Sequence, residues 1–192
     1  MRTLYLDCGM GAAGDMLTAS LLQLFSEPVK QVKKLNDLKI PGVKYQLVAC
    51  TRCGIRGYQV RVFVKGQEEE NLHMQTEEHV GHKSEKHTQE HGHHSMSQIV
   101  RLINRLEIED QVKQDAVAVY KLIAKAEGKA HGQRMDEIHF HEVGTMDAVA
   151  DVVAVCYLLN ELQVDQILAS PVRVGYVHME SFRCRHRQQR IL

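Results

Sequence analysis

Hydrophobic positions in the first third of the chain switch from alternating to helical spacing and back. Alternation over Thr3–Asp7 predicts a first strand, and the apolar spacing over Ala12–Phe25 predicts a helix. A weaker helix is predicted over Val29–Leu38. A β-hairpin follows, with strands at Val43–Ala49 and Tyr58–Val64 and a turn at Cys53–Gly57.

Helical spacing returns in the last half of the chain. Apolar residues over Ile99–Leu106 mark one helix, and those over Val112–Ala126 mark a longer one. Asp147–Leu159 is apolar on nearly every side, which predicts a helix buried in the core. Short strands are predicted at Asp136–Phe140 and Val164–Ala169. The whole pattern predicts a mixed α/β (α+β) fold, a small sheet with helices packed on it.

The interval from Lys65 to Met96 has almost no apolar residues. Such a segment cannot bury enough surface to offset the entropy lost when it orders. We therefore expect a mobile His-rich loop, residues 66–96, inserted in one domain spanning 1–178. Deleting Leu72–Ser95 is expected to cost little stability. Residues 179–192 have no hydrophobic period and are expected to lie outside the fold as an unstructured tail.

Composition excludes several classes of protein. The 192 residues carry 24 basic and 24 acidic side chains, and this balance argues against nucleic acid or an anionic membrane as the partner. No apolar run reaches the ~18 residues of a membrane span, and the N-terminus does not resemble a secretion signal. Five Cys at uneven spacing do not form a disulfide framework, so we expect a cytoplasmic protein.

A glycine-rich turn, Gly9–Gly14, follows the first strand and matches GxGxxG. The dinucleotide-binding hypothesis is disfavoured, because a hairpin replaces the required βαβ unit and Asp15 stands where a phosphate needs positive potential. A tight strand-to-helix turn is the alternative. Asp7 ends the first strand, at the edge where open α/β sheets bind ligands, and a structural role for it stays equally open. The chain has no GxxxxGK[ST] motif, which excludes the usual P-loop nucleotide site.

The strongest local signal is the run Ile138–Gly144, which contains His139, His141 and Glu142. In an extended segment the two histidines share a side, and imidazole is a common ligand of nickel, zinc and copper. Asp147 and Asp151 follow at i and i+4 on one helix face, where two carboxylates repel unless a cation or proton lies between them. Ordinary surface histidines and a solvated helix face remain the alternative.

Seven of the 12 histidines gather in the His-rich loop, which suggests loose capture of divalent ions rather than a fixed four-ligand site. The alternative is a low-complexity solvated linker. A further pair, Glu127 and His131, precedes the run at 138–144 at i and i+4 spacing. A single CxxC, Cys50 to Cys53, is weak support for zinc or redox chemistry.

Together these motifs resemble the LarC family, the nickel-insertion proteins of lactate racemase cofactor synthesis. The similarity runs from residue 3 to about 178. The resemblance implies that Ni(II) is delivered to a pyridinium bis-thiocarboxylate mononucleotide to give a nickel-pincer cofactor with a metal–carbon bond. It also implies that the full-length product is a metal chelatase of the lyase class that consumes CTP with a divalent cation. The matching pieces are Asp7-Cys8, Gly11, Gly14-Asp15-Met16, Gly54-Ile55-Arg56-Gly57, Ala126-Glu127, His131-Gly132, Ile138–Gly144, Asp147, Asp151 and Ser170-Pro171-Val172.

The tail from His178 to Leu192 departs from the family, whose members continue with a Pro- and Ala-rich segment. One set of codons for this tail, shifted by one nucleotide, encodes that family segment. We therefore expect an out-of-frame tail, with the C-terminal half encoded in another frame. A programmed frameshift, a disrupted gene and a sequencing slip stay open, as does activity of the short chain alone. A His-rich nickel-storage module without catalysis is the alternative function.

From the acid-bearing loops at the two strand ends we predict a compact site in which Asp7 lies within ~15 Å of His141, as a shared ligand shell requires. Its catalytic carboxylates are predicted to be Asp7, Asp15 and Glu142, and Gly11 and Gly14 are predicted to hold the cofactor. Oligomeric state stays open, and a homo-oligomer is compatible with this site. The predicted metal-binding residues are His139, His141, Asp147, Asp151, His131, His73, His79, His82, His87, His91, His93 and His94.

Overall fold

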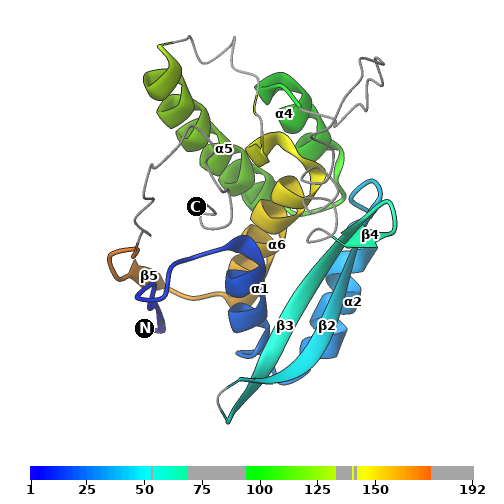
Figure 1. The fold of residues 1–192 in the computed structure, drawn as a ribbon, viewed down its shortest axis with the longest axis vertical. Coiled ribbons are helices and arrows are strands. Elements are labelled where there is room, and N and C mark those ends of the chain that lie inside the picture. Colours follow the sequence, from blue (N-terminus) through cyan, green and yellow to red (C-terminus); the bar gives the residue numbers. More distant parts are fainter. Residues whose placement is uncertain (53, 69–93, 133–139, 141, 174–192) are drawn as a thin grey trace, which may run out of the picture.

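The computed structural model describes residues 1–52, 54–68, 94–132, 140 and 142–173 (Figure 1). Helices and strands alternate irregularly along the chain, in a mixed α/β fold with helices packed on small sheets, as predicted. The elements are β1 (Thr3–Leu6), α1 (Gly14–Leu22), α2 (Pro28–Asp37), β2 (Val43–Arg52), β3 (Ile55–Val64), β4 (Gln67–Glu68), α4 (Met96–Arg105), α5 (Asp110–His131), η1 (Glu142–Gly144), α6 (Met146–Leu162) and β5 (Gln166–Ala169).

The hairpin β2–β3 is longer than its sequence pattern predicts. The antiparallel ladder runs from Val43 paired with Val64 to Arg52 paired with Ile55, so only residues 53 and 54 connect the strands. Gly54 adopts a positive φ of 80°, which glycine tolerates without steric cost. The predicted five-residue turn was therefore wrong at its edges, because ladder pairing continues into polar residues that have no hydrophobic alternation.

The start of the predicted His-rich loop is also structured differently. Gln67–Glu68 forms β4, a short antiparallel continuation of the β2–β3 sheet, where we expected irregular chain. At the other end, Met96 already belongs to α4. Most of the predicted loop, residues 69–93, lies outside the described residues, as do the tail and most of the strand predicted at Asp136–Phe140. Phe140 itself is described and is not in a strand.

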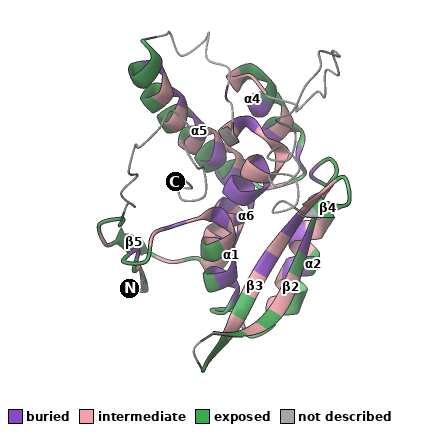
Figure 2. Ribbon diagram, viewed as in Figure 1, coloured by how far each residue is buried: buried purple, intermediate pink, exposed green. Residues whose placement is uncertain are grey.

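Helix α6 forms the centre of the core, as its apolar composition predicts (Figure 1). It packs against α1, α5, η1 and both long strands of the hairpin. The buried stripe of α5 repeats every fourth residue, which is the helical spacing expected of one covered face. Figure 2 shows α6 as largely buried. The buried stripe of α5 consists of Val112, Ala116, Tyr120, Ala124 and Gly128.

Strands β1 and β5 form a separate, two-stranded parallel sheet. In the described part of the chain β1 is followed by two helices and the antiparallel hairpin rather than by a parallel neighbour. This order lacks the βαβ unit that a dinucleotide-binding glycine turn requires, in agreement with the sequence analysis. No helix in the described part is both long and apolar enough to span a membrane.

Candidate functional site

The glycine-rich turn after β1 is held by backbone and side-chain hydrogen bonds. The carboxylate of Asp7 accepts the N–H of Gly9 at 2.9 Å, and the N–H of Gly11 donates to the carbonyl of Cys8 at 3.0 Å. Gly11 has a φ of +91°, a conformation that L side chains rarely adopt. The turn therefore fixes Asp7 at the carboxyl end of β1, at the sheet edge where the sequence placed it.

The chain after β5 runs beside this turn. The Ser170 hydroxyl accepts the N–H of Cys8 at 2.8 Å, and the N–H of Arg173 donates to the Cys8 carbonyl at 3.1 Å. The loop after β1 and the segment after β5, from opposite ends of the described chain, are thus hydrogen-bonded to each other. Ser170 belongs to one of the motifs that carried the family resemblance, and its role here is to tie the two strand ends together.

Helices α1 and α6 lie in close contact at Gly14 and Asp151. A β-carbon added at Gly14 would lie 2.3 Å from the Cβ of Asp151 and 2.5 Å from its Cγ and Oδ2. No real side chain tolerates such distances, so glycine is required at this position by packing. The predicted cofactor-binding residue Gly14 therefore has a clear structural role, which is to admit the Asp151 carboxyl to the start of α1.

Asp151 is buried, with 8% of its surface exposed, and its Oδ1 has no hydrogen-bond partner in the described part of the chain. Burial raises the pKa of this carboxyl to about 8, and the neighbouring carboxylates of Asp15 and Asp147 add to the rise. Two of the predicted site residues on α6 therefore share one electrostatic environment with Asp15 at the start of α1. This is the arrangement of close carboxylates that the sequence analysis predicted to need a proton or a cation.

A second buried polar group lies one helical turn after Gly14. Thr18 is 1% exposed, and its hydroxyl oxygen also lacks a hydrogen-bond partner among the described residues. Its place on α1, four residues after Gly14, puts it on the face that packs against α6. Sequence analysis gave no signal for Thr18, because a buried threonine in a helix has no distinctive spacing.

Two tyrosines from different elements brace the backbone around the acidic cluster of Asp15, Asp147 and Asp151. The Tyr45 hydroxyl donates to the carbonyl of Ala150 at 2.7 Å, and the Tyr120 hydroxyl donates to the carbonyl of Val143 at 3.2 Å. Burial raises the pKa of both phenols, and nearby carboxylates contribute, so both stay protonated donors. The apolar spacing over Val112–Ala126 predicts the helix, but it reveals neither the burial of Tyr120 nor its hydrogen bond.

The run at 138–144 is anchored at Phe140 and Gly144. The Phe140 ring packs edge-on against Tyr120, with ring centroids 5.8 Å apart and planes at 63°. His94 Nδ1 lies 2.9 Å from the Gly144 carbonyl oxygen. Because a carbonyl only accepts, Nδ1 carries the proton, and the lone pair of this imidazole is on Nε2. His94 is thus joined to the end of the motif, rather than being part of a free loop.

The remaining predicted site residues divide into two groups. His131 is exposed at the end of α5 and pairs with Glu127, Nε2 to Oε2 3.2 Å, as the i and i+4 spacing predicts. Glu142 lies in η1, but its side chain is outside the described residues. The predicted distance between Asp7 and His141 stays a prediction. Also outside the described residues are His139, His141, His73, His79, His82, His87, His91 and His93.

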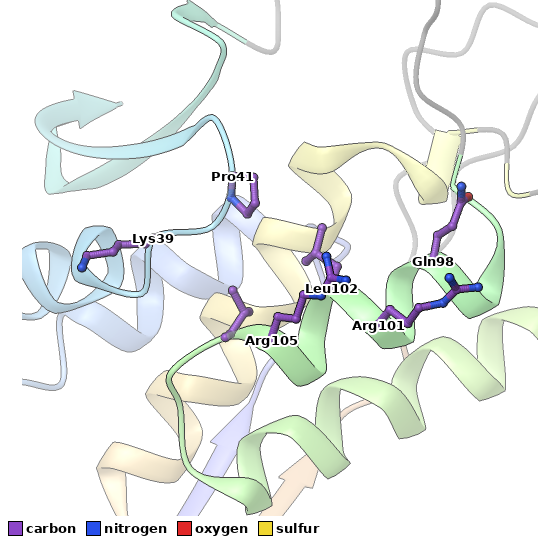
Figure 3. A pocket seen from close by; sticks show the side chains of 7 residues that line it. Lys39, Pro41, Gln98, Arg101, Leu102 and Arg105 are labelled. Carbon is purple, nitrogen blue, oxygen red and sulfur yellow. The ribbon is translucent and has the colours of Figure 1, made fainter.

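Within the described residues, no three or more His, Cys, Asp or Glu side chains are placed to hold a metal ion. A shallow cavity of about 340 Å³ lies elsewhere, between the α2–β2 connection and α4 (Figure 3). Arg101 and Arg105 line it from α4, whereas the Lys39 side chain extends away from them. None of its lining residues belongs to the predicted site.

Comparison with known proteins identifies the family. The family model described as "Nickel insertion protein" matches residues 4–186. The chain belongs to the nickel insertion protein family. This confirms the resemblance stated from the motifs, which covered nearly the same span. No solved structure matches the chain.

The relatives share about a third of their aligned residues with this member of the nickel insertion family. A pyridinium-3,5-bisthiocarboxylic acid mononucleotide nickel insertion protein from Geobacillus kaustophilus is 33% identical over 186 residues, which is 97% of this chain and 41% of the relative. Proteins of the same name from Alkaliphilus metalliredigens and Akkermansia muciniphila are 32% and 33% identical, over 95% and 91% of this chain and 42% and 40% of the relatives. The chain spans about two-fifths of the length of these relatives.

Proposed function

We propose that this chain is the nickel-binding part of a nickel insertion protein. It binds Ni(II) as a substrate and delivers it to pyridinium-3,5-bisthiocarboxylic acid mononucleotide. The observation that carries the proposal is the family match over residues 4–186, because the names of several relatives state this metal and this mononucleotide. Within the described part of the chain, the acidic cluster of Asp15, Asp147 and Asp151 is not arranged to hold a metal ion without further ligands. It supports the proposal because a cation bound beside it relieves the repulsion between its carboxylates.

The proposed nickel ligands combine imidazole and carboxylate. His139 and His141 supply nitrogen donors of the kind that nickel prefers. Asp147 and Asp151 supply oxygen donors, and Asp151 does so by exchanging the proton that it holds in the metal-free protein for the metal ion. His94 adds an imidazole whose Nδ1–H is held by the Gly144 carbonyl, which is the usual second contact of a metal-binding histidine. His131 at the end of α5 and the histidines of the His-rich loop other than His94 capture nickel loosely before it reaches this site.

The proposed chemistry releases a proton. In the product, nickel is bonded to the pyridinium carbon between the two thiocarboxylates, so that carbon exchanges its C–H bond for a bond to nickel. The proton needs an acceptor, and a carboxylate close to the metal serves as general base. Asp7, Asp15 and Glu142 are the proposed catalytic carboxylates, and Gly11 allows the nucleotide to approach the turn after β1. The Asp151 carboxyl fills the space at Gly14, so this glycine contributes to the site by admitting that carboxyl.

The finer parts of the proposal concern the whole protein. The full-length product is proposed to be a cytoplasmic metal chelatase of the lyase class, with CTP and its divalent cation bound by the C-terminal half. The nickel-pincer product then activates lactate racemase. Two-fifths coverage of the relatives is consistent with a division of work in which this chain carries nickel and the remainder completes the reaction.

Nickel binding by the acidic cluster is tested with point variants. Asp15→Asn and Asp147→Asn are expected to lower the affinity of the tightest nickel site at least tenfold in isothermal titration, because each removes a charge beside Asp151. The control is Asp37→Asn, an exposed aspartate at the end of α2, which is expected to bind nickel like the wild type. Unchanged affinity in both test variants contradicts a nickel site at the acidic cluster.

Turnover is tested with nickel, CTP and the thiocarboxylated mononucleotide. We expect no cofactor from the 192-residue chain alone and formation of cofactor by a fusion whose frame is restored near Val177. Turnover by the short chain refutes the division of work. Inactivity of the fusion, with nickel still bound, favours the alternative function, a His-rich nickel store without catalysis. The density of histidine between His73 and His94 is the observation behind that alternative.

A further inference from the structure

The parallel sheet of β1 and β5 is largely uncovered. Tyr5 pairs with Leu168 and Leu4 with Ile167, so each pair lies on one face of the sheet. Leu4 packs against the core, whereas Tyr5 is 60% exposed and Leu168 46% exposed on the opposite face. Even Ile167, on the face of Leu4, is 45% exposed. Figure 2 shows β5 as exposed, and Figure 1 places the pair at the edge of the molecule.

Such a sheet is physically unusual. Parallel sheets occur almost only with both faces covered, and two strands alone are marginally stable in water. Within the described residues the sheet has only two strands, so the outer edge of each is unpaired. Unpaired edges beside exposed apolar side chains form a template for another strand. The sheet is therefore built as part of a larger one.

The gathering of apolar residues on this sheet distinguishes it from the rest of the surface. Leu122 on α5, Val29 on α2 and Ile55 on β3 are also strongly exposed, but they lie on separate elements. Single exposed apolar residues are ordinary, whereas a contiguous set marks an interaction surface. On the sheet, Tyr5 and Leu168 form an adjoining exposed pair on one face, Ile167 is exposed on the other face, and Val172 is exposed in the segment that follows β5.

We propose that this sheet is the docking surface for the polypeptide that the relatives carry outside the matched region. That polypeptide accounts for roughly three-fifths of each relative, since this chain covers 40–42% of them. It contributes at least one strand to an edge of the β1–β5 sheet and an apolar layer over Tyr5 and Leu168. The carboxyl ends of β1 and β5, with Asp7 and Ser170, then lie next to the interface.

The proposal rests on family membership and on the sheet, and it does not depend on nickel chemistry. Loss of nickel binding therefore does not bear on it, and a covered sheet does not establish the proposed function. If both are right, the active site is completed where the two parts of the protein meet.

Thiol accessibility tests the docking surface. Leu168→Cys in this chain is compared with cysteine at the aligned position of the full-length Geobacillus kaustophilus relative, and alkylation of that peptide is followed by mass spectrometry. We expect labelling to be at least tenfold slower in the full-length protein. Tyr5→Cys, on the paired strand, is expected to behave in the same way. Leu122→Cys on α5 is the control, with less than a threefold difference expected. Equal rates at the Leu168 and Tyr5 positions overturn the proposal.

Two other occupants give distinct results, and each overturns the proposal. If a second copy covers the sheet, the 192-residue chain sediments as a dimer and labelling of Leu168→Cys slows as protein concentration rises. If residues after Arg173 of this chain cover it, a version ending at Arg173 is labelled at least tenfold faster than the full chain. The proposal expects a monomer and equal labelling of the two lengths.

Discussion

Gly14 has no space for a side chain, because the Asp151 carboxyl occupies the position of a β-carbon at 2.3–2.5 Å. We expect Gly14→Ala to force α1 and α6 apart and to lower the free energy of unfolding by about 1–3 kcal/mol, as overpacked cores do. Urea unfolding measures the change. Gly57→Ala is the matched control, because its β-carbon would meet only Gln23 Oε1, at 3.9 Å. Equal loss in both variants contradicts the close-packing role of Gly14.

Asp151 makes stability depend on pH in an unusual direction. Its pKa is about 8 in the folded protein and about 3.9 when unfolded, so between these values only the folded state holds the proton. The free energy of unfolding therefore falls as pH rises from about 4 to 8. In metal-free buffer we expect the wild type to lose a few kcal/mol relative to Asp151→Asn between pH 5 and 8. If the free energy of unfolding depends on pH in the same way in both proteins, the carboxyl is ionised in the folded state and the prediction is contradicted.

His94 has a structural contact that is separable from metal binding. His94→Ala removes the Nδ1–H bond to the Gly144 carbonyl, and we expect a loss of about 0.5–1.5 kcal/mol in the free energy of unfolding. His94→Asn places an amide donor near the Nδ1 position and is expected to restore most of it. Nickel titration of His94→Asn against the wild type then reports on Nε2, since asparagine keeps a donor for the Gly144 carbonyl but lacks that nitrogen. Equal stability of Ala and Asn variants contradicts a structural role for this bond.

At the scale of elements, α4 begins with a complete capping box. The Ser95 hydroxyl accepts the N–H of Gln98, and the Gln98 side chain accepts the N–H of Ser95 at 2.7 Å. We expect Ser95→Ala to lower the free energy of unfolding by about 1 kcal/mol and Ser95→Asn to stay near the wild type, because asparagine also caps. Thermal unfolding compares the two variants. An alanine variant as stable as the wild type shows that α4 does not depend on its cap.

The same contacts bear on the expected dispensability of the His-rich loop, which stays a prediction. A deletion of Leu72–Ser95 removes His94, which bonds Gly144, and Ser95, which caps α4. The composition of the segment predicted a negligible cost, but composition does not reveal which polar residues at its end have partners. A deletion that spares both residues, 72–93, separates the loop from the helix start.

At the scale of the whole molecule, nickel capture and folding are expected to be separable. Deletion of residues 72–93 removes six histidines, so equilibrium dialysis is expected to detect fewer weakly bound nickel ions while the melting temperature of the metal-free protein stays unchanged. In the wild type these ions are expected to leave as pH falls below the histidine pKa of ~6.5, because protonated imidazole has no lone pair. Weak binding that survives the deletion contradicts the capture role of the loop.

The sequence by itself determined the order of the helices α1, α2, α4, α5 and α6 and of the strands β1, β2, β3 and β5, the central burial of α6 and the family. Periodicity reports which face of a helix or strand avoids water, and that information is local. It also placed Asp147 and Asp151 one turn apart on α6. The acidic spacing predicted a shared charge environment, and the compact site predicted from the sequence included Asp15 on α1 together with Asp147.

Only the tertiary structure decided which distant residues meet. The contact of Gly14 with Asp151, the hydroxyl of Tyr120 on the Val143 carbonyl and the bond from His94 to Gly144 join elements far apart in the chain. The pairing of β1 with β5 is also of this kind. A buried position in a sequence pattern specifies that something must cover it but not which element does so. Which element covers a given face depends on how all the apolar faces of the helices and strands are buried against one another at the same time.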